Sequence, residues 1–193
     1  MGWYLHEIKD TIQWLIDNPG WYTCLEGLAW DVINGHRLLI CGNGWSAADA
    51  QHLAAELVVR FEKERKALPA IALTTDSSIL TATGNDYNFD RIFSRQVEAL
   101  GNEWDVLVVF STSGNSKNCI EAIKAARAKN MKVFGFLWKG WGEIKHLCDS
   151  SIVIPGDTTS HIQECHMILY HMLCKMIDLL LIMPLWKLQS SEI

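Results

Sequence analysis

Short apolar runs rich in β-branched residues alternate with helical segments along most of this chain. The runs are Arg37–Cys41, Ala70–Leu73, Val106–Phe110, Lys132–Leu137 and Ser151–Ile154. Their apolar residues are continuous rather than alternating with polar ones, which is typical of parallel strands buried on both faces. The pattern predicts an α/β fold: a three-layer, doubly wound, five-stranded parallel sheet with helices on both sides. Such sheets bind ligands at the carboxyl ends of their strands.

Helical periodicity fills the intervals between these runs and both ends of the chain. The segments between strands are Ser46–Phe61, Asp76–Thr83 with Phe89–Leu100, Ser116–Lys129 and Gly142–Cys148. Apolar stripes within 5–16 and 25–33 predict two N-terminal helices, and a long C-terminal helix is expected from Ser160 to Ile182. A length of 193 residues suits a single domain. We expect N-terminal helices in 1–34, an α/β core in 35–158, and a site and interface helix in 159–183.

Charge and cysteine usage limit the classes of function. A net charge of −5 argues against broad binding to nucleic acid or anionic membranes. Six scattered cysteines and the absence of a secretory signal predict a cytoplasmic protein with free thiols. The apolar stretch Met167–Leu185 is interrupted at helical spacing by His171, Lys175 and Asp178, and Pro184 ends it. This favours a buried or interface helix over a membrane span.

Two small, polar loops each join a predicted strand to a predicted helix. The first is Gly42-Asn43-Gly44-Trp45-Ser46 and the second runs from Ser111 to Ser116. A loop that opens a helix presents backbone N–H groups where the helix dipole is positive, and this arrangement binds anions. The same residue types also serve as helix caps and turns. For the first loop the two explanations are evenly balanced, whereas four hydroxyls in six residues of the second favour a phosphate site.

Four residues on two predicted helices have side chains that bind metals or transfer protons. His52 and Glu56 share a face at i and i+4, and Gln163 and His171 are two turns apart on the last helix. Two imidazoles, a carboxylate and an amide oxygen are a possible Zn²⁺ site. Spacing alone is more often explained by a surface His–Glu pair and by a satisfied core histidine than by a metal site. Two neighbours compete for the same roles, namely Glu164 and His166.

Motifs shared with a known family span the chain from Gly35 to Leu180. They are Gly42-Asn43-Gly44 with Ser46–His52, Ala70–Asp76, Gly84-Asn85-Asp86, Phe93–Val97, Ser111–Ser116 and Ile162-Gln163-Glu164. In this combination the chain resembles the phosphoheptose isomerases of the sugar-isomerase (SIS) fold, which is flavodoxin-like. The resemblance implies an enzyme that converts sedoheptulose 7-phosphate to D-glycero-D-manno-heptose 7-phosphate for bacterial heptose and lipopolysaccharide precursors. It also implies a homotetramer with sites between subunits, and one Zn²⁺ per subunit.

The resemblance assigns roles residue by residue. The metal positions correspond to His52, Glu56, Gln163 and His171. The phosphate loop corresponds to Ser111, Thr112, Ser113 and Ser116. Substrate contacts correspond to Asn43, Gly44, Trp45, Ser46, Asn85 and Asp86, with Glu56 and Gln163. Aldose–ketose isomerisation through an enediol needs a base and a second proton carrier, for which we predict Glu56 and His171.

Two other functions are alternatives to this enzyme. A replication-initiation factor that associates with DnaA resembles these isomerases but lacks the acidic and histidine pair. Both Glu56 and His171 are present here, which favours the enzyme. A sugar-phosphate sensor or another SIS isomerase is the third hypothesis, and the Gln51-His52 and Ile162–Glu164 motifs argue against it.

Four of the nine tryptophans stand where the resembled family mostly has small residues. They are Trp45, Trp104, Trp138 and Trp141. Trp45 lies in the first ligand loop, where a glycine permits close backbone approach or a positive φ. We therefore expect the indole of Trp45 to reduce activity.

Overall fold

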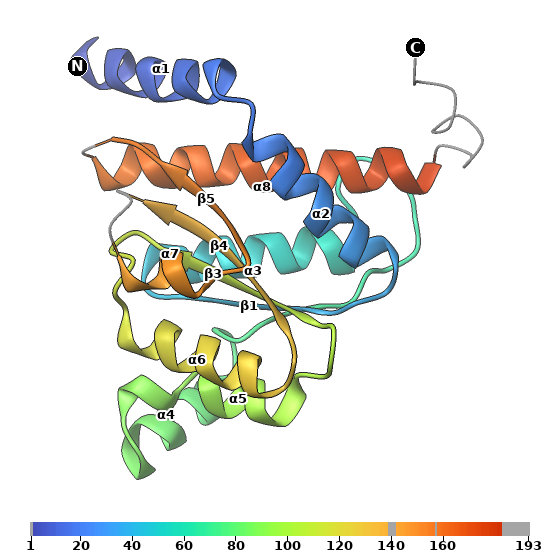
Figure 1. The fold of residues 1–193 in the computed structure, drawn as a ribbon, viewed down its shortest axis with the longest axis vertical. Helices are drawn as coiled ribbons and strands as arrows, with labels where there is room; N and C mark the ends of the chain where they lie inside the picture. Colours follow the sequence, from blue (N-terminus) through green and yellow to red (C-terminus); the bar gives the residue numbers. More distant parts are fainter. Residues whose placement is uncertain (1, 139–141, 157, 183–193) are drawn as a thin grey trace.

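The computed structural model describes residues 2–138, 142–156 and 158–182. Its five strands form one parallel sheet in the order β2-β1-β3-β4-β5, which confirms the predicted doubly wound α/β fold (Figure 1). The strands are β1 (Leu38–Gly42), β2 (Ala70–Ala72), β3 (Val106–Ser111), β4 (Lys132–Trp138) and β5 (Ser150–Ile154). Every residue of β1 and β3 is buried, as the continuous apolar runs predict for strands covered on both faces.

Helices cover both faces of this sheet (Figure 1). Their bounds are α1 (Gly2–Asp17), α2 (Trp21–Ile33), α3 (Trp45–Val58), α4 (Ser77–Asp86), α5 (Ser94–Leu100), α6 (Lys117–Ala128), α7 (Glu143–Leu147) and α8 (Thr159–Ile182). One core contains side chains of α2, α3 and α8, and the other contains side chains of α5, α6 and α7. The predicted helix Phe89–Leu100 is divided into a 3₁₀ turn at Phe89–Arg91 and α5, with Ile92 and Phe93 buried at the junction.

Helix α8 is long and apolar enough to cross a membrane by length and composition alone. In the fold, however, it packs against α2 and α3 and contributes buried side chains to one core. It also buries Asp178, which forms an ion pair with Arg65 at 2.9 Å. A buried, paired carboxylate and extensive packing are typical of a core helix in a globular domain.

Candidate active site

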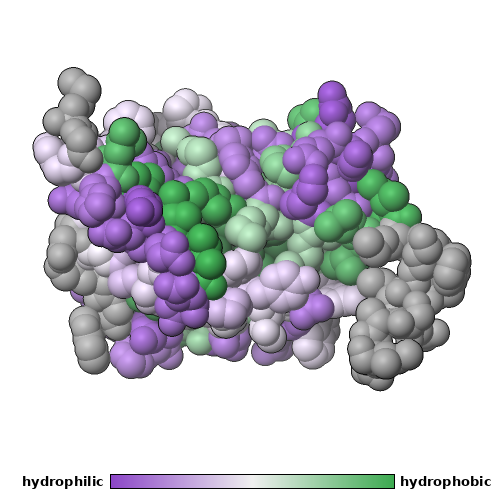
Figure 2. All heavy atoms as spheres, turned by 90° about the horizontal axis from the view of Figure 1, so that it is seen from above, coloured by the Kyte–Doolittle hydropathy of each residue, from purple (hydrophilic) through white to green (hydrophobic). Residues whose placement is uncertain are grey.

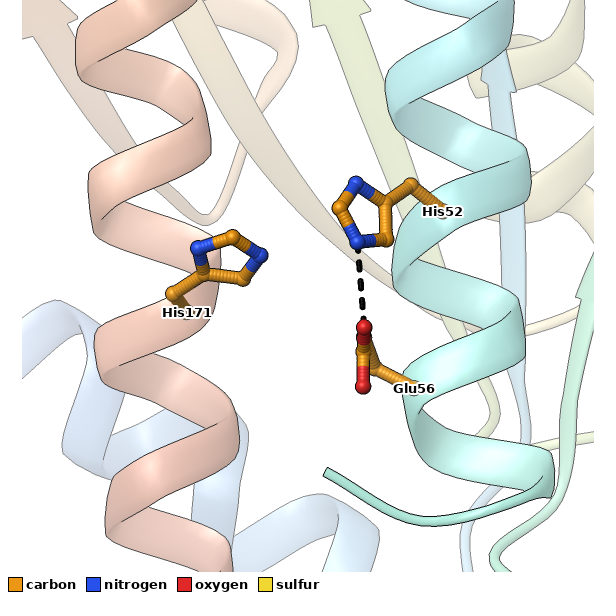
Figure 3. A group of neighbouring side chains, drawn as sticks. All are labelled: His52, Glu56 and His171. Carbon is orange, nitrogen blue, oxygen red and sulfur yellow. Dashed lines mark hydrogen bonds and ion pairs between the residues drawn. The ribbon is translucent and has the colours of Figure 1, made fainter. Parts of the chain in front are cut away.

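Three of the predicted metal-ligand side chains converge between α3 and α8 (Figure 3). His52 and Glu56 point from the same face of α3, with 3.0 Å between Nε2 and Oε1. His171 faces them from α8, and its ring centroid is 5.0 Å from that of His52. Possible ligand atoms of all three residues lie within 4.8 Å of one another. Two imidazole nitrogens and a carboxylate oxygen at this spacing fit a Zn²⁺-type site.

Tyr170 orients the ring of His52. Its hydroxyl is 2.9 Å from Nδ1 of His52, and burial raises the pKa of this phenol well above its usual value. The phenol therefore stays protonated, and its hydroxyl can either donate to Nδ1 or accept from Nδ1–H, depending on the tautomer of His52. When His52 binds a metal through Nε2, Nδ1–H can donate to the same hydroxyl. Such outer partners fix the orientation of histidine ligands.

His171 lies in a partly desolvated aromatic setting. The ring of Phe61 stacks on it with centroids 5.4 Å apart and planes 28° apart. Burial lowers the pKa of His171, and His52 lowers it further, while Glu56 acts in the opposite direction. The imidazole is thus biased toward its neutral form, which has one N–H donor and one free lone pair.

Gln163, the fourth predicted ligand, points toward the start of α3. Its Nε2 donates to the carbonyl oxygen of Trp45 at 3.2 Å, and its amide also stabilises the carboxylate of Asp49. Burial nevertheless raises the pKa of Asp49 to about 6, and Asp49 Oδ2 has no partner within the described residues. The structure thus joins His52, Glu56 and His171 as one cluster and gives the Gln163 amide a different contact.

The two competing residues on α8 are engaged elsewhere. Glu164 accepts a hydrogen bond from the hydroxyl of Tyr4 at 2.7 Å, so it faces α1. His166 is fully buried, with Nε2 3.2 Å from the carbonyl oxygen of Leu137 in β4. These contacts leave His171 as the residue of this group that faces His52 and Glu56.

The first predicted ligand loop turns at Gly44, whose φ of +58° is the left-handed conformation that favours glycine. Trp45 is the first residue of α3, and the only described non-glycine residues with positive φ are Trp104 and Asn130. Trp45 therefore does not adopt the positive φ for which a glycine would be needed, because Gly44 before it makes the turn. The indole itself is 78% exposed.

A reciprocal amide pair connects the two predicted ligand loops. Asn43 Nδ2 donates to Asn118 Oδ1 at 2.9 Å, and Asn118 Nδ2 donates to Asn43 Oδ1 at 2.8 Å. Asn118 lies in the first turn of α6, directly after the second loop. The start of α3, with the buried Ser46, is thereby fixed relative to the start of α6.

Hydroxyls shape the second loop, which lies between β3 and α6. Ser111 Oγ accepts from the Gly114 N–H at 3.1 Å, and Ser113 Oγ accepts from the Asn115 N–H at 3.2 Å. Ser116 occupies the N-cap position of α6 but makes no side-chain cap bond, and its Oγ is 3.3 Å from Ser113 Oγ. The cap explanation thus fails for Ser116, whereas two other serines do stabilise turns. Thr112, beside them, is half-buried.

Asn85 and Asp86 lie at the end of α4, which Figure 1 shows on the opposite side of the sheet from α8. Both are exposed, and Asn85 Nδ2 donates to Asp86 Oδ1 at 2.8 Å. Within one chain, these two predicted substrate residues and His171 are therefore on different faces of the fold.

Two of the other unusual tryptophans, Trp104 and Trp138, lie near strand ends. Trp104 has a φ of +71° before β3, a strained conformation for a bulky side chain. Trp138 ends β4, and its Nε1 donates to the carbonyl oxygen of Gly156 at 2.8 Å. Trp141 lies outside the described residues.

The motifs did not reveal several residues that organise the site. Phe61 and Tyr170 gave no periodic or spacing signal, because their partners belong to a different helix. Asp49 had a usable signal, since it precedes His52 by three residues and so shares a face of α3. Asn118 follows the second loop by two residues, but its partner Asn43 is 75 residues away.

Comparison with known proteins gives a consistent result. The model of the SIS domain family matches residues 25–137. Phosphoheptose isomerase 1 of Campylobacter jejuni subsp. jejuni serotype O:2 is 59% identical over 144 residues, which are 75% of this chain and 77% of that protein. The phosphoheptose isomerase of Nitratiruptor sp. is 52% identical over 155 residues, which are 80% of this chain and 81% of the other.

Solved structures agree with the sequence comparisons. Phosphoheptose isomerase GmhA from Neisseria gonorrhoeae has a TM-score of 0.79 and 42% identity, covering 90% of this chain and 92% of that one. A phosphoheptose isomerase from Francisella tularensis has a TM-score of 0.81 and 39% identity, covering 88% and 93%. The protein therefore belongs to the phosphoheptose isomerase family of SIS-domain proteins.

Proposed function

We propose that this protein converts sedoheptulose 7-phosphate to D-glycero-D-manno-heptose 7-phosphate by aldose–ketose isomerisation through an enediol. Family membership supports a sugar-phosphate isomerase. The observation that carries the proposal is the convergence of Glu56 and His171, with His52, between α3 and α8. We place the reaction in the cytoplasm, in the supply of heptose precursors for lipopolysaccharide.

The chemistry requires proton transfer between neighbouring carbons. Glu56 is the base that removes the proton α to the carbonyl, and its hydrogen bond to His52 fixes the carboxylate. His171 is the second proton carrier. Because burial biases its imidazole toward the neutral form, the ring can donate a proton to a developing oxyanion and recover it afterwards.

His52, Glu56 and His171 would hold a Zn²⁺ ion, with Gln163 as a further ligand if its amide turns away from Trp45. A bound Zn²⁺ would polarise the substrate carbonyl. The donor set supports this, because the Tyr170 hydroxyl directs Nε2 of His52 toward Glu56.

The two loops would bind the rest of the substrate. The N–H groups at the start of α6 and the Ser111, Thr112, Ser113 and Ser116 hydroxyls would hold the phosphate. Asn43, Gly44 and Ser46 would contact the sugar. The exposed indole of Trp45 stands at this loop, where we propose that it lowers substrate affinity.

We propose a homotetramer with sites between subunits. Figure 2 shows apolar side chains gathered on the face that contains α1 and α8, and exposed apolar residues of these two helices include Leu5, Ile16, Leu179 and Ile182. Exposed apolar groups of this kind mark association surfaces. Association would also let Asn85 and Asp86 of one chain approach the cluster of another. Light scattering after size exclusion measures the assembly.

One experiment tests the function directly. Metal analysis and a coupled isomerase assay with sedoheptulose 7-phosphate are run on the same purified sample. Glu56→Gln is expected to abolish turnover while the protein still folds and assembles. Wild-type activity in this variant would remove Glu56 from the role of base. Absence of activity in the wild-type protein, together with capture of DnaA, would favour the non-catalytic alternative.

A further inference from the structure

A buried arginine closes the end of the helix that carries His52 and Glu56. Arg65 follows α3 by seven residues, and its side chain is 3% exposed. Its guanidinium donates to the carbonyl oxygens of Glu56 at 2.6 Å and Leu57 at 2.9 Å. Carbonyls at a helix C-terminus lack intrahelical partners and carry partial negative charge, so a cation is a suitable partner. One of these two carbonyl groups is that of Glu56, whose carboxylate is the proposed base.

The same arginine is tied to α8 through Asp178, which is 1% exposed. Arg65 Nε donates to Asp178 Oδ1 at 2.9 Å, and the backbone N–H groups of Glu62 and Lys63 donate to Oδ2 at 3.1 Å each. A second ion pair connects Lys175 of α8 to Glu62. The segment after α3 is thus fixed to α8 by side-chain and backbone contacts.

These contacts are connected to both proposed proton-transfer residues, Glu56 and His171. Asp178 lies seven residues after His171, which is two turns along the same face of α8. Phe61, in the segment fixed by Asp178, stacks on the His171 ring. The network therefore touches Glu56 through its carbonyl and His171 through Phe61.

The buried ion pair between Arg65 and Asp178 is an inefficient means of stabilising the fold. Burying two charges has a desolvation cost that their attraction often fails to exceed, and apolar replacements are frequently as stable. In some proteins a buried ion pair instead serves to fix the geometry between the elements that it connects.

We propose that Arg65 and Asp178 are positioning residues that set the separation and orientation of the Glu56 carboxylate relative to the His171 imidazole. This inference rests on the proposed function, because it assumes that these two side chains act together on substrate or metal. Neither Arg65 nor Asp178 contacts the reacting atoms; both act through α3, α8 and Phe61.

Arg65→Lys tests the proposal, because it keeps the charge opposite Asp178 but loses the planar fork that reaches both carbonyls. We expect kcat to fall about 10–100-fold with KM within about two-fold, and Zn²⁺ affinity to fall about 10–100-fold. Affinity is measured by competition with a chromophoric chelator on metal-stripped protein. Asp178→Asn, which keeps the shape of the side chain, is a second variant in case Arg65→Lys does not fold.

Val97→Ala is the matched control. Val97 is fully buried in the core on the opposite face of the sheet, so this change lowers Tm without touching the network. We expect it to leave kcat and Zn²⁺ affinity unchanged. The proposal is overturned if the folded Arg65 or Asp178 variants retain Zn²⁺ affinity within about two-fold, or lose no more than Val97→Ala. If wild-type protein shows no isomerase activity, the proposed function fails, and Zn²⁺ affinity still decides the positioning role.

Discussion

His166 makes the stability of this protein depend on pH in a way that follows from its surroundings. The ring is fully buried between α8 and β4, near the rings of Phe110 and Phe136. Burial lowers its pKa from 6.5 to about 4, although Nε2 lies near the carbonyl oxygen of Leu137. Because the pKa is lower in the folded state, the unfolded chain binds a proton first on acidification. The contribution of His166 to the free energy of unfolding is therefore fully present above about pH 6.5, and it is lost as the pH falls toward 4.

The lowered pKa corresponds to about 3 kcal/mol in total, since each unit is worth about 1.4 kcal/mol. Between pH 7 and pH 5 the expected loss is about 2 kcal/mol, a substantial part of the roughly 5–15 kcal/mol that stabilises an ordinary domain. His166→Leu removes the titrating group and keeps an apolar side chain in the core. The variant should lose about 2 kcal/mol less than wild type over this interval.

Urea unfolding at both pH values measures the effect. A chelator is present throughout and protein concentration is held fixed, because bound metal and association also change apparent stability. His146→Leu, which replaces an exposed histidine in the same way, controls for the loss of a histidine as such. Equal losses in wild type and His166→Leu would refute the reasoning.

Three further predictions concern the unusual loops. Trp104→Gly should relieve the strain of the left-handed backbone, which is worth about 1–2 kcal/mol. The added freedom of the unfolded chain costs about 0.4–1 kcal/mol, so the net effect should be a higher Tm in a thermal scan. An unchanged or lower Tm would contradict this. Trp45→Gly should raise kcat/KM for sedoheptulose 7-phosphate in the coupled assay, and no gain would mean that the indole is accommodated. Gly114→Ala should lower the free energy of unfolding by about 1–3 kcal/mol and raise KM. The reason is that Gly114 has a φ of +66° and that the new Cβ would lie 2.9 Å from the Cα of Gly142. A variant with the KM and the urea midpoint of the wild type would exclude this strain.

The elements of the fold could be predicted because their causes are local. A strand covered on both faces needs continuous apolar residues, and Val106–Phe110 has them. The order of the strands is not a local property. The end of α3 is also poorly predicted from local sequence. Apolar spacing predicts a helix as far as Phe61, but the helix in the structure ends at Val58. Arg65 binds the carbonyl oxygens of Glu56 and Leu57 near this end, and its partner Asp178 is 113 residues away.

The sequence by itself determined the α/β architecture and the pairing of His52 with Glu56, because both depend on periodicity along one segment. The motifs then indicated that His171 joins them. Only the tertiary structure decided how His171 is held, which atom of His52 faces Glu56, and which tryptophan has a strained backbone. Phe61, Tyr170 and Arg65 act across the contact between α3 and α8, so their roles depend on the packing of segments far apart in the chain. Spacing within a helix is set by the sequence, whereas contacts between helices exist only once the sheet has placed them side by side.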